Sequence, residues 1–262
     1  MGGGRPLDAR LRSELARQGF TGRVESTLTV RLGRPVNRSL AETGRLLWFD
    51  TVTGLNGDNS CGGCHSPLTG FGDTQSIAIG IDNNGIVGPG RSGPRNMRRA
   101  PSVINTAFFP RLMWNSRFAS LSGDPFDNSA GFAFPPPEGL LLSHMSHLLD
   151  AQAFMHDGAF TTLETAIGHH LDVTASVRAY DPVRAGLDGD LTGPIGPVGP
   201  MLQRVDSLLA SPLQLSGPEV RQLVAFVRVG LLDPGARPER LRRLIPDRVP
   251  SGARVMVFQP QR

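Results

Sequence analysis

The chain has two cysteines, Cys61 and Cys64, and a histidine follows them directly at His65. Cys-x-x-Cys-His is the attachment pattern for a c-type haem. Each thiol adds to one vinyl group of the haem, and the two intervening residues match the spacing of those groups. The imidazole of the next residue then becomes the proximal ligand of the iron. This motif constrains the fold more than any other feature, because it predicts a chain that surrounds one covalently attached haem.

Two other interpretations of the cysteine pair stay open. A structural zinc site needs four ligands, and His144 and His147 could supply the remaining two. A thioredoxin-like dithiol needs a strand directly before the first cysteine, but residues 55–60 have the composition of a loop. The adjacent His65 favours haem over both.

Composition excludes several other classes of protein. With 32 glycines and 22 prolines in 262 residues, the chain must be rich in turns and irregular loops. No apolar run approaches the roughly 18 residues that a membrane span requires, so we expect no span. The 27 lysine and arginine positions are all arginine, and the net charge is only +4. Because the arginines are scattered, we expect no binding to nucleic acid.

The N-terminal residues show no secretory signal, because a charged segment followed by an apolar one is missing. This leaves a cytosolic protein, or a leader that lies outside this chain. Haem is attached to c-type motifs outside the cytoplasm, so the motif favours the second interpretation. We therefore expect a periplasmic protein.

Hydrophobic periodicity and turn residues predict a mainly α fold with long Gly/Pro-rich loops. Helices are expected at residues 7–18, 39–49, 140–153, 161–171 and 216–229. Three of them begin with an expected capping box, which pairs Ser39 with Glu42, Thr161 with Glu164 and Ser216 with Glu219. Residues 51–96 and 182–200 are expected to form loops, and the tail from Pro234 is expected to wrap the surface.

Several short segments follow one another in an order that is typical of one protein family. They are Gly44–Asp50, Asp58–His65, Gly70–Asp73, Gly93–Asn96, Ala100–Phe108, Met113–Arg117, Phe154–Gly158 and Thr162–Ile167. Together they resemble the di-haem cytochrome c peroxidase family, which includes the MauG-like proteins. The resemblance implies a cytochrome c-like haem domain at residues 1–150. It also implies the C-terminal remnant of a second cytochrome c-like domain at residues 151–262.

One departure from the family pattern matters more than the matches. The family carries two Cys-x-x-Cys-His motifs, one in each domain, whereas this chain carries one. About forty residues separate Arg117 from His156, which is too few for most of a cytochrome domain. We therefore expect an internally shortened chain that lacks most of the second haem domain.

The resemblance also implies roles for residues outside the motif. Trp114 matches the tryptophan that lies between the two haems of the family. His170 lies where the family places a ligand of the second iron, so it is expected as a distal ligand here. Asn96 matches an asparagine of a calcium site. Residues 76–82, where the bacterial peroxidases place a distal histidine, contain no histidine.

The remaining polar and sulfur-containing candidates have simpler expected roles. His156 belongs to the motif that packs near the second haem in the family. Met113 and Met155 are expected as core residues. Glu138 is expected at the surface and is a poor substitute for the family's acid–base glutamate.

The resemblance implies reduction of hydrogen peroxide to water with electrons from a small redox protein, a cytochrome c or a cupredoxin. Peroxide is expected at the open side of the haem, with electrons delivered through Trp114. The second haem and the acid–base glutamate both fall in the missing part, so we expect a slow enzyme. The alternatives are a one-haem electron-transfer protein without turnover and a non-catalytic zinc module on Cys61 and Cys64.

Overall fold

The computed structural model describes residues 4–19, 30, 35–96, 98–106, 109, 111–112, 118–122, 130, 132–133, 158–230 and 233–260. Within these residues the chain is mainly helical with little strand, which agrees with the predicted mainly α class. The chain divides into two compact units, Met1–Ala41 with Asn105–Pro136 and Glu42–Ile104 with Pro137–Arg262. The expected domain boundary at residue 150 and the expected helix at 140–153 lie outside the described residues and stay predictions.

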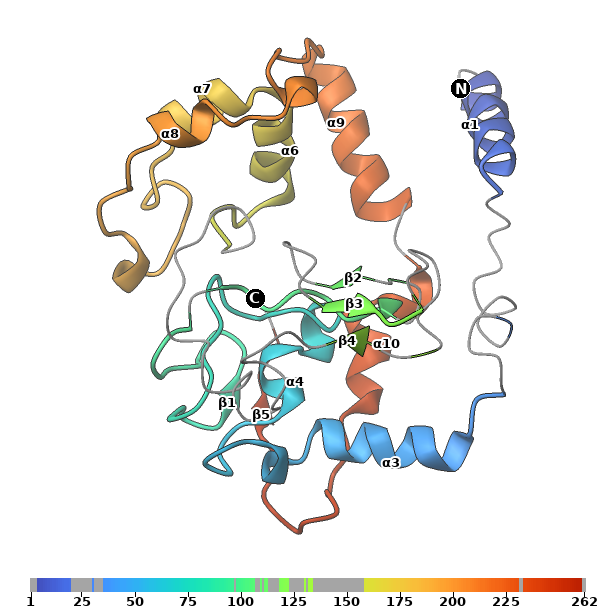
Figure 1. Cartoon of the computed structure of the whole chain (residues 1–262), viewed down its shortest axis with the longest axis vertical. Helices are drawn as coiled ribbons and strands as arrows, with labels where there is room; N and C mark the ends of the chain where they lie inside the picture. Colours follow the sequence, from blue (N-terminus) through green and yellow to red (C-terminus); the bar gives the residue numbers. More distant parts are fainter. Residues whose placement is uncertain are drawn as a thin grey trace. The chain divides into compact units, whose positions relative to one another are not determined.

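The first unit contains helix α1 (Gly4–Arg17) and a three-stranded antiparallel sheet (Figure 1). Helix α1 agrees with the helix predicted at 7–18. Strands β2 (Arg111–Leu112), β3 (Phe118–Ser120) and β4 (Phe132–Ala133) pair in the order β2-β3-β4. The sequence pattern did not predict this small sheet, because its strands are only two or three residues long.

Helix α3 (Arg38–Trp48) begins in the first unit, ends in the second and leads into the cysteine motif. It agrees with the helix predicted at 39–49, but the predicted cap is wrong. The helix starts at Arg38, so Ser39 lies inside it. The side-chain oxygen of Asn37 accepts a hydrogen bond from the Leu40 amide at 3.0 Å, which makes Asn37 the capping residue.

The segment after α3 is irregular, as its glycine-rich composition predicted. Its regular parts are the 3₁₀ turn η1 (Thr51–Thr53), the single helical turn α4 (Cys61–Cys64), the 3₁₀ turn η2 (Pro67–Thr69) and strand β1 (Ile86–Val87). The motif therefore lies on a short helical turn between loops.

The C-terminal part of the second unit is built from short helices. They are α6 (Leu163–Leu171), α7 (Val173–Arg178), η5 (Gly189–Leu191), α8 (Gly199–Leu202), η6 (Ser207–Leu209), α9 (Gly217–Ala225), the π-helical turn η7 (Phe226–Gly230), η8 (Pro234–Ala236), α10 (Pro238–Leu241) and η9 (Arg242–Leu244). Helices α6 and α9 agree with the helices predicted at 161–171 and 216–229. Among the described residues, none of the helices has the length and apolar character needed to cross a membrane.

The two predicted capping boxes in this part have different outcomes. Ser216 donates its backbone N–H and its hydroxyl to the Glu219 carboxylate, both at 2.7 Å, which confirms the box at α9. The box predicted at Thr161 is wrong by one position. Helix α6 is capped by Thr162, whose hydroxyl oxygen accepts a hydrogen bond from the Thr165 amide at 3.2 Å.

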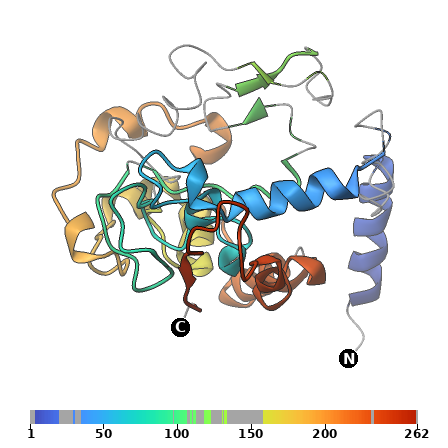
Figure 2. The ribbon, with the colours of Figure 1, turned by 90° about the horizontal axis from the view of Figure 1, so that it is seen from below.

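The C-terminal tail contributes to the core of the second unit. Strand β5 (Val257–Phe258) runs parallel to β1, with Ile86 opposite Val257 and Val87 opposite Phe258. Figure 2 shows the tail beside the segment that follows α3. Val249 and Met256 are buried. Most of the tail is exposed, as expected for a segment that wraps the surface, but these two side chains and β5 also tie it to the interior of the unit.

Candidate haem site

The two cysteines lie at the ends of the single helical turn α4, and both thiols are free and partly exposed. Burial raises the pKa of Cys61 above its ordinary value. Burial, and next the nearby carboxylate of Asp73, raise the pKa of Cys64 to about 11. Both side chains are therefore protonated thiols at neutral pH.

The two residues between the cysteines must be glycines for steric reasons. A Cβ atom at Gly62 would lie 2.8 Å from the Phe49 ring. A Cβ atom at Gly63 would lie 2.1 Å from Oδ1 of Asn59. The backbone of α4 thus packs directly against these two buried side chains, which fixes the position of the turn that carries both thiols.

His65 is held in an orientation suited to metal ligation. Its Nδ1 atom lies 2.8 Å from the carbonyl oxygen of Pro101. A carbonyl can only accept, so Nδ1 carries the proton and Nε2 keeps its lone pair for a ligand. Burial lowers the pKa of His65 below its ordinary value, although hydrogen bonds to the backbone of Pro101 and of Phe71 act in the opposite direction. The imidazole is therefore neutral at neutral pH.

Trp48, the last residue of α3, packs against the imidazole ring of His65. Its ring centroid lies 5.9 Å from that of His65 and 5.9 Å from that of Phe71. Its indole N–H points at the backbone carbonyl of His65 at 3.4 Å. The imidazole is thus positioned from α3 and from the loop that contains Pro101.

This donor set fits a c-type haem. Two free thiols separated by two residues are followed by a neutral imidazole whose lone pair is on Nε2, which is the combination that thioether attachment and axial ligation require. The zinc alternative lacks further ligands in the part of the chain that the structure describes, since no group of three or more His, Cys, Asp or Glu side chains there could hold a metal ion. His144 and His147 lie outside the described residues.

His170 and its neighbour His169 have different surroundings. His170 is exposed on α6, and its Nδ1 lies 2.8 Å from the carbonyl oxygen of Ala166. His169 is only 5% exposed, and its Nδ1 lies 3.0 Å from the hydroxyl of Ser176. The two rings therefore face different environments, as adjacent positions on a helix require.

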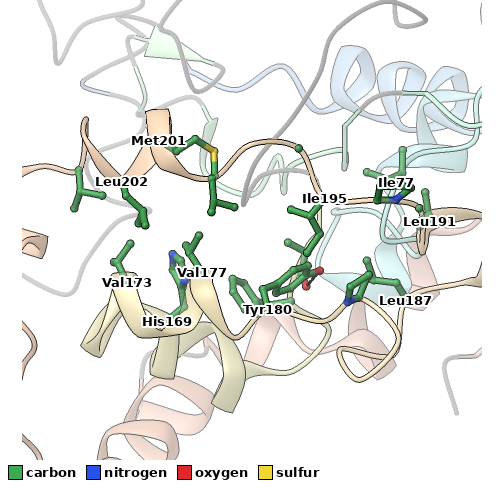
Figure 3. A pocket seen from close by; sticks show the side chains of 18 residues that line it. Ile77, His169, Val173, Val177, Tyr180, Leu187, Leu191, Ile195, Met201 and Leu202 are labelled. Atoms are coloured by element: carbon green, nitrogen blue, oxygen red, sulfur yellow. Dashed lines mark hydrogen bonds between the residues drawn. The ribbon is translucent and has the colours of Figure 1, made fainter.

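His169 lines an apolar cavity of about 560 Å³. Its other lining residues include Ile77, Phe160, Val177, Tyr180 and Met201. Figure 3 shows the His169 ring between Val173 and Val177. Burial lowers the pKa of His169, and the nearby His170 lowers it further. The cavity thus offers one neutral imidazole in an apolar wall.

Asn96 lies against the loop that follows the cysteine motif. A Cβ atom at Gly80 would lie 3.2 Å from its side-chain nitrogen, and its backbone N–H donates to the carbonyl of Ala78 at 2.6 Å. Its neighbour Arg95 forms ion pairs with Asp188 and Asp190. Calcium binding at Asn96 stays a prediction. The remaining candidates, Trp114, Met113, Met155, His156 and Glu138, lie outside the described residues.

Sequence reasoning missed several residues that shape the site. Pro101 belongs to one of the family-like segments, but its carbonyl acts through the backbone, which no side-chain pattern reveals. Asn59 and Arg91 are both buried beside Cys64. Met256 reaches the turn before the motif from the tail, where its sulfur accepts a hydrogen bond from the Ser60 hydroxyl at 3.6 Å. These residues come from separate segments of the chain, and only the folded structure brings them to the motif, so no local sequence pattern could have predicted them.

Comparison with known proteins identifies a family match. Residues 38–177, more than half of the chain, match the family model described as di-haem cytochrome c peroxidase. No solved structure matches the chain significantly.

Three curated relatives illustrate this similarity. The methylamine utilization protein MauG of Methylophilus methylotrophus is 29% identical over 90 residues, which cover 34% of this chain and 24% of the relative. Cytochrome-c peroxidase IdrP2 of Denitromonas iodatirespirans is 34% identical over 83 residues, or 31% of this chain and 19% of the relative. Cytochrome c551 peroxidase of Nitrosomonas europaea is 28% identical over 115 residues, or 44% and 31%. The matches therefore span less than a third of the relatives' lengths.

Proposed function

Because the chain belongs to the di-haem cytochrome c peroxidase family, we propose that it carries one covalent haem c and reduces hydrogen peroxide. Its electrons would come from a small redox protein, a cytochrome c or a cupredoxin. Cys61 and Cys64 form the two thioether bonds, and His65 is the proximal ligand. We place the functional protein in the periplasm, because c-type haem attachment takes place outside the cytoplasm.

One observation carries this proposal. The hydrogen bond from His65 Nδ1 to the Pro101 carbonyl puts the proton on Nδ1 and leaves the lone pair on Nε2, in the residue that directly follows the second of the two free cysteines. A backbone acceptor on the proximal histidine fixes its ring orientation and raises its basicity toward a metal.

The residues of the site have different proposed roles. When bound, the haem would supply an iron that exchanges electrons and reacts with peroxide. His65 binds that iron, and Trp48 and Pro101 hold the His65 ring in place. Trp114 is proposed as the electron path, His170 as a distal ligand and Asn96 as a calcium ligand, all from the family resemblance.

The proposed stoichiometry is tested by intact mass. Two cysteines can tether one haem, so denatured protein produced with a c-type maturation system should carry one covalent haem. The double variant Cys61→Ser with Cys64→Ser should carry none. An absorption spectrum shows at the same time whether haem or zinc is bound. A second covalent haem, or zinc in place of haem, would refute the assignment.

The second candidate function is one-haem electron transfer without peroxide turnover. It is favoured by the single Cys-x-x-Cys-His motif in this chain, since the family carries two. Peroxide-dependent oxidation of a reduced cytochrome separates the two candidates. Turnover above that of the double cysteine variant supports the peroxidase, and its absence supports the electron carrier.

A further inference from the structure

Five exposed arginines lie close together in sequence near the C-terminus of the chain. They fall within residues 237–248, which also hold two carboxylates, Glu239 and Asp247, so the segment has a net charge of +3. We call the five exposed arginines the arginine patch, and its members are Arg237, Arg240, Arg242, Arg243 and Arg248.

Helical spacing aligns three members of the arginine patch. Arg237, Arg240 and Arg243 are three residues apart along α10 and η9, so successive turns place them one above another. The apolar Leu241 and Ile245, between and after them, are half-buried. This segment therefore turns its apolar side toward the unit and its basic side toward solvent.

The arginine patch keeps its positive charge. Among the described residues, none of its five members forms an ion pair. By contrast, Arg95 is paired with Asp188 and Asp190, and Arg45 is paired with Glu42. A guanidinium cannot be deprotonated in a protein, and its planar fork matches the geometry of a carboxylate. The patch is thus a permanently basic surface suited to carboxylates.

The arginine patch lies beside the candidate haem site. Both α10 and η9 contact η2, which begins two residues after His65 (Figure 1). The carbonyl of Leu244 in η9 accepts a hydrogen bond from Arg45 on α3, the helix whose last residue, Trp48, packs against His65. The buried Val249 fixes the chain directly after the patch. The basic surface is therefore held next to the proposed proximal ligand.

We propose that the arginine patch is the docking surface for an electron-donor protein whose contact face is acidic. This inference rests on the proposed function, because it requires a haem that accepts electrons. Opposite charges steer the encounter, and electron-transfer complexes are weak and bury little surface, so a small patch is sufficient. In the docked pair the metal of the donor loses one electron and the haem iron gains it, and no bond forms or breaks.

An acidic protein fits this surface better than an anionic membrane does. A helix that binds a membrane surface inserts an apolar face beside its basic residues. Here the apolar Leu241 and Ile245 are half-buried. The position of the patch next to the haem motif also gives a redox partner a reason to bind there, whereas a membrane would gain nothing from it.

The test uses one lysine-rich cytochrome c in two charge states. Succinylation turns each lysine of this probe from positive to negative. Surface plasmon resonance gives the Kd of both forms for the haem-loaded chain at about 20 and about 200 mM salt. At low salt the succinylated form should bind at least about tenfold more tightly, and the preference should shrink at high salt because the charges are screened. Equal binding of the two forms would overturn the proposal.

The double variant Arg240→Gln with Arg243→Gln tests the patch itself. It should weaken binding of the succinylated probe by about fivefold at low salt. Arg178→Gln with Arg184→Gln is the matched control, because it removes two exposed arginines of the same unit that form no ion pair within the described ranges. Its effect should stay below about twofold. Equal losses would show that only net charge matters, which would overturn the proposal.

Two further measurements support this comparison. Arg240→Lys with Arg243→Lys keeps both charges and should retain most of the affinity, whereas a loss as large as that of the glutamine variant would overturn the proposal. Surface substitutions seldom disturb folding, and circular dichroism checks each variant. Vesicles of phosphatidylglycerol are the competing ligand. If they bind the patch more tightly than the succinylated probe does, the proposal of a protein partner is wrong.

A second readout separates this proposal from the proposed function. Stopped-flow mixing of the ferrous succinylated probe with the oxidised chain follows reduction of the haem without peroxide. The rate should fall in the Arg240→Gln, Arg243→Gln variant but not in the control, and tight binding without reduction would overturn the proposal. Normal haem reduction without peroxide turnover would refute the peroxidase and leave the docking surface intact. A chain whose spectrum shows no haem would refute the proposed function before any donor is added.

Discussion

Gly63 has no room for a side chain. A methyl group there would overlap Oδ1 of Asn59, so we expect Gly63→Ala to lower the free energy of unfolding by about 1–3 kcal/mol. Gly44 in α3 is the matched control, because a Cβ atom there would have nothing within 4 Å. Gly44→Ala should stabilise by about 0.5–1 kcal/mol, since alanine favours helix. Thermal unfolding of the haem-loaded proteins measures both, and similar effects would contradict the packing argument.

The distal role proposed for His170 has a spectroscopic test. If His170 is the sixth ligand, His170→Ala should convert a six-coordinate low-spin ferric spectrum toward high spin and increase the reaction with peroxide. His169→Phe is the control, because His169 lies in the apolar cavity rather than at the exposed surface. An unchanged spectrum in His170→Ala would remove His170 from the site.

At the scale of elements, the contact between Asp50 and Ser251 fastens the tail to the end of α3. The Ser251 hydroxyl and backbone N–H donate to the Asp50 carboxylate at 2.6 and 2.9 Å. Burial alone would raise the pKa of Asp50, but the hydrogen bonds from Ser251 and Val52 outweigh it and lower the pKa below the ordinary 3.8. The ionised carboxylate thus stabilises the fold.

This pKa shift predicts how stability depends on pH. A lowered folded-state pKa gives stability that is fully present above the unfolded-state value and is lost as the pH falls through the folded-state value. Asp50→Asn should therefore cost about 1–3 kcal/mol at neutral pH, and the difference from wild type should shrink below about pH 4. Thermal unfolding across this range is the measurement. Combining Asp50→Asn with Ser251→Ala should be non-additive, and additive effects would contradict a direct contact.

The elements that could be predicted from sequence are those with local signals. Helix α9 has an apolar face and the Ser216 capping box, and both could be predicted from the sequence. The burial of Met256 and the pairing of β1 with β5 could not be predicted from the sequence. These depend on residues far apart in the chain, and a two-residue strand has no periodicity of its own. The caps of α3 and α6 were misplaced by one or two positions, because neighbouring polar residues compete for the same role.

The candidate haem site also combines residues that a local pattern predicts with residues that only the fold brings together. Cys61, Cys64 and His65 were predicted because covalent haem attachment requires this spacing. Pro101, whose carbonyl contacts His65, and Arg91, which is buried near Cys64, lie tens of residues away in an irregular loop. Only the folded loop brings a particular carbonyl or guanidinium to the motif.

For the whole molecule, we expect slow peroxide turnover. The chain has one haem motif, and the family resemblance places the acid–base glutamate in the part that the chain is expected to lack. Loss of a proton-transfer group costs roughly 10²–10⁴ in rate, so turnover should fall below that of a two-haem relative by at least the lower figure. The measurement is peroxide-dependent oxidation of a reduced cytochrome donor, with both proteins assayed side by side. Comparable rates would show that another residue supplies the acid–base group.

The pairing of β1 with β5 also has a consequence for the order in which the chain folds. Ile86 and Val257 are neighbours across 171 positions of chain, so this contact cannot form until synthesis has reached Val257. Long loops are slow to close, and folding rates fall as contacts span more of the sequence. The haem motif is therefore synthesised long before the tail that completes its packing. Until then Met256 is missing from its place against Ser60 and Gly63, so the turn that carries Cys61 and Cys64 is only partly packed.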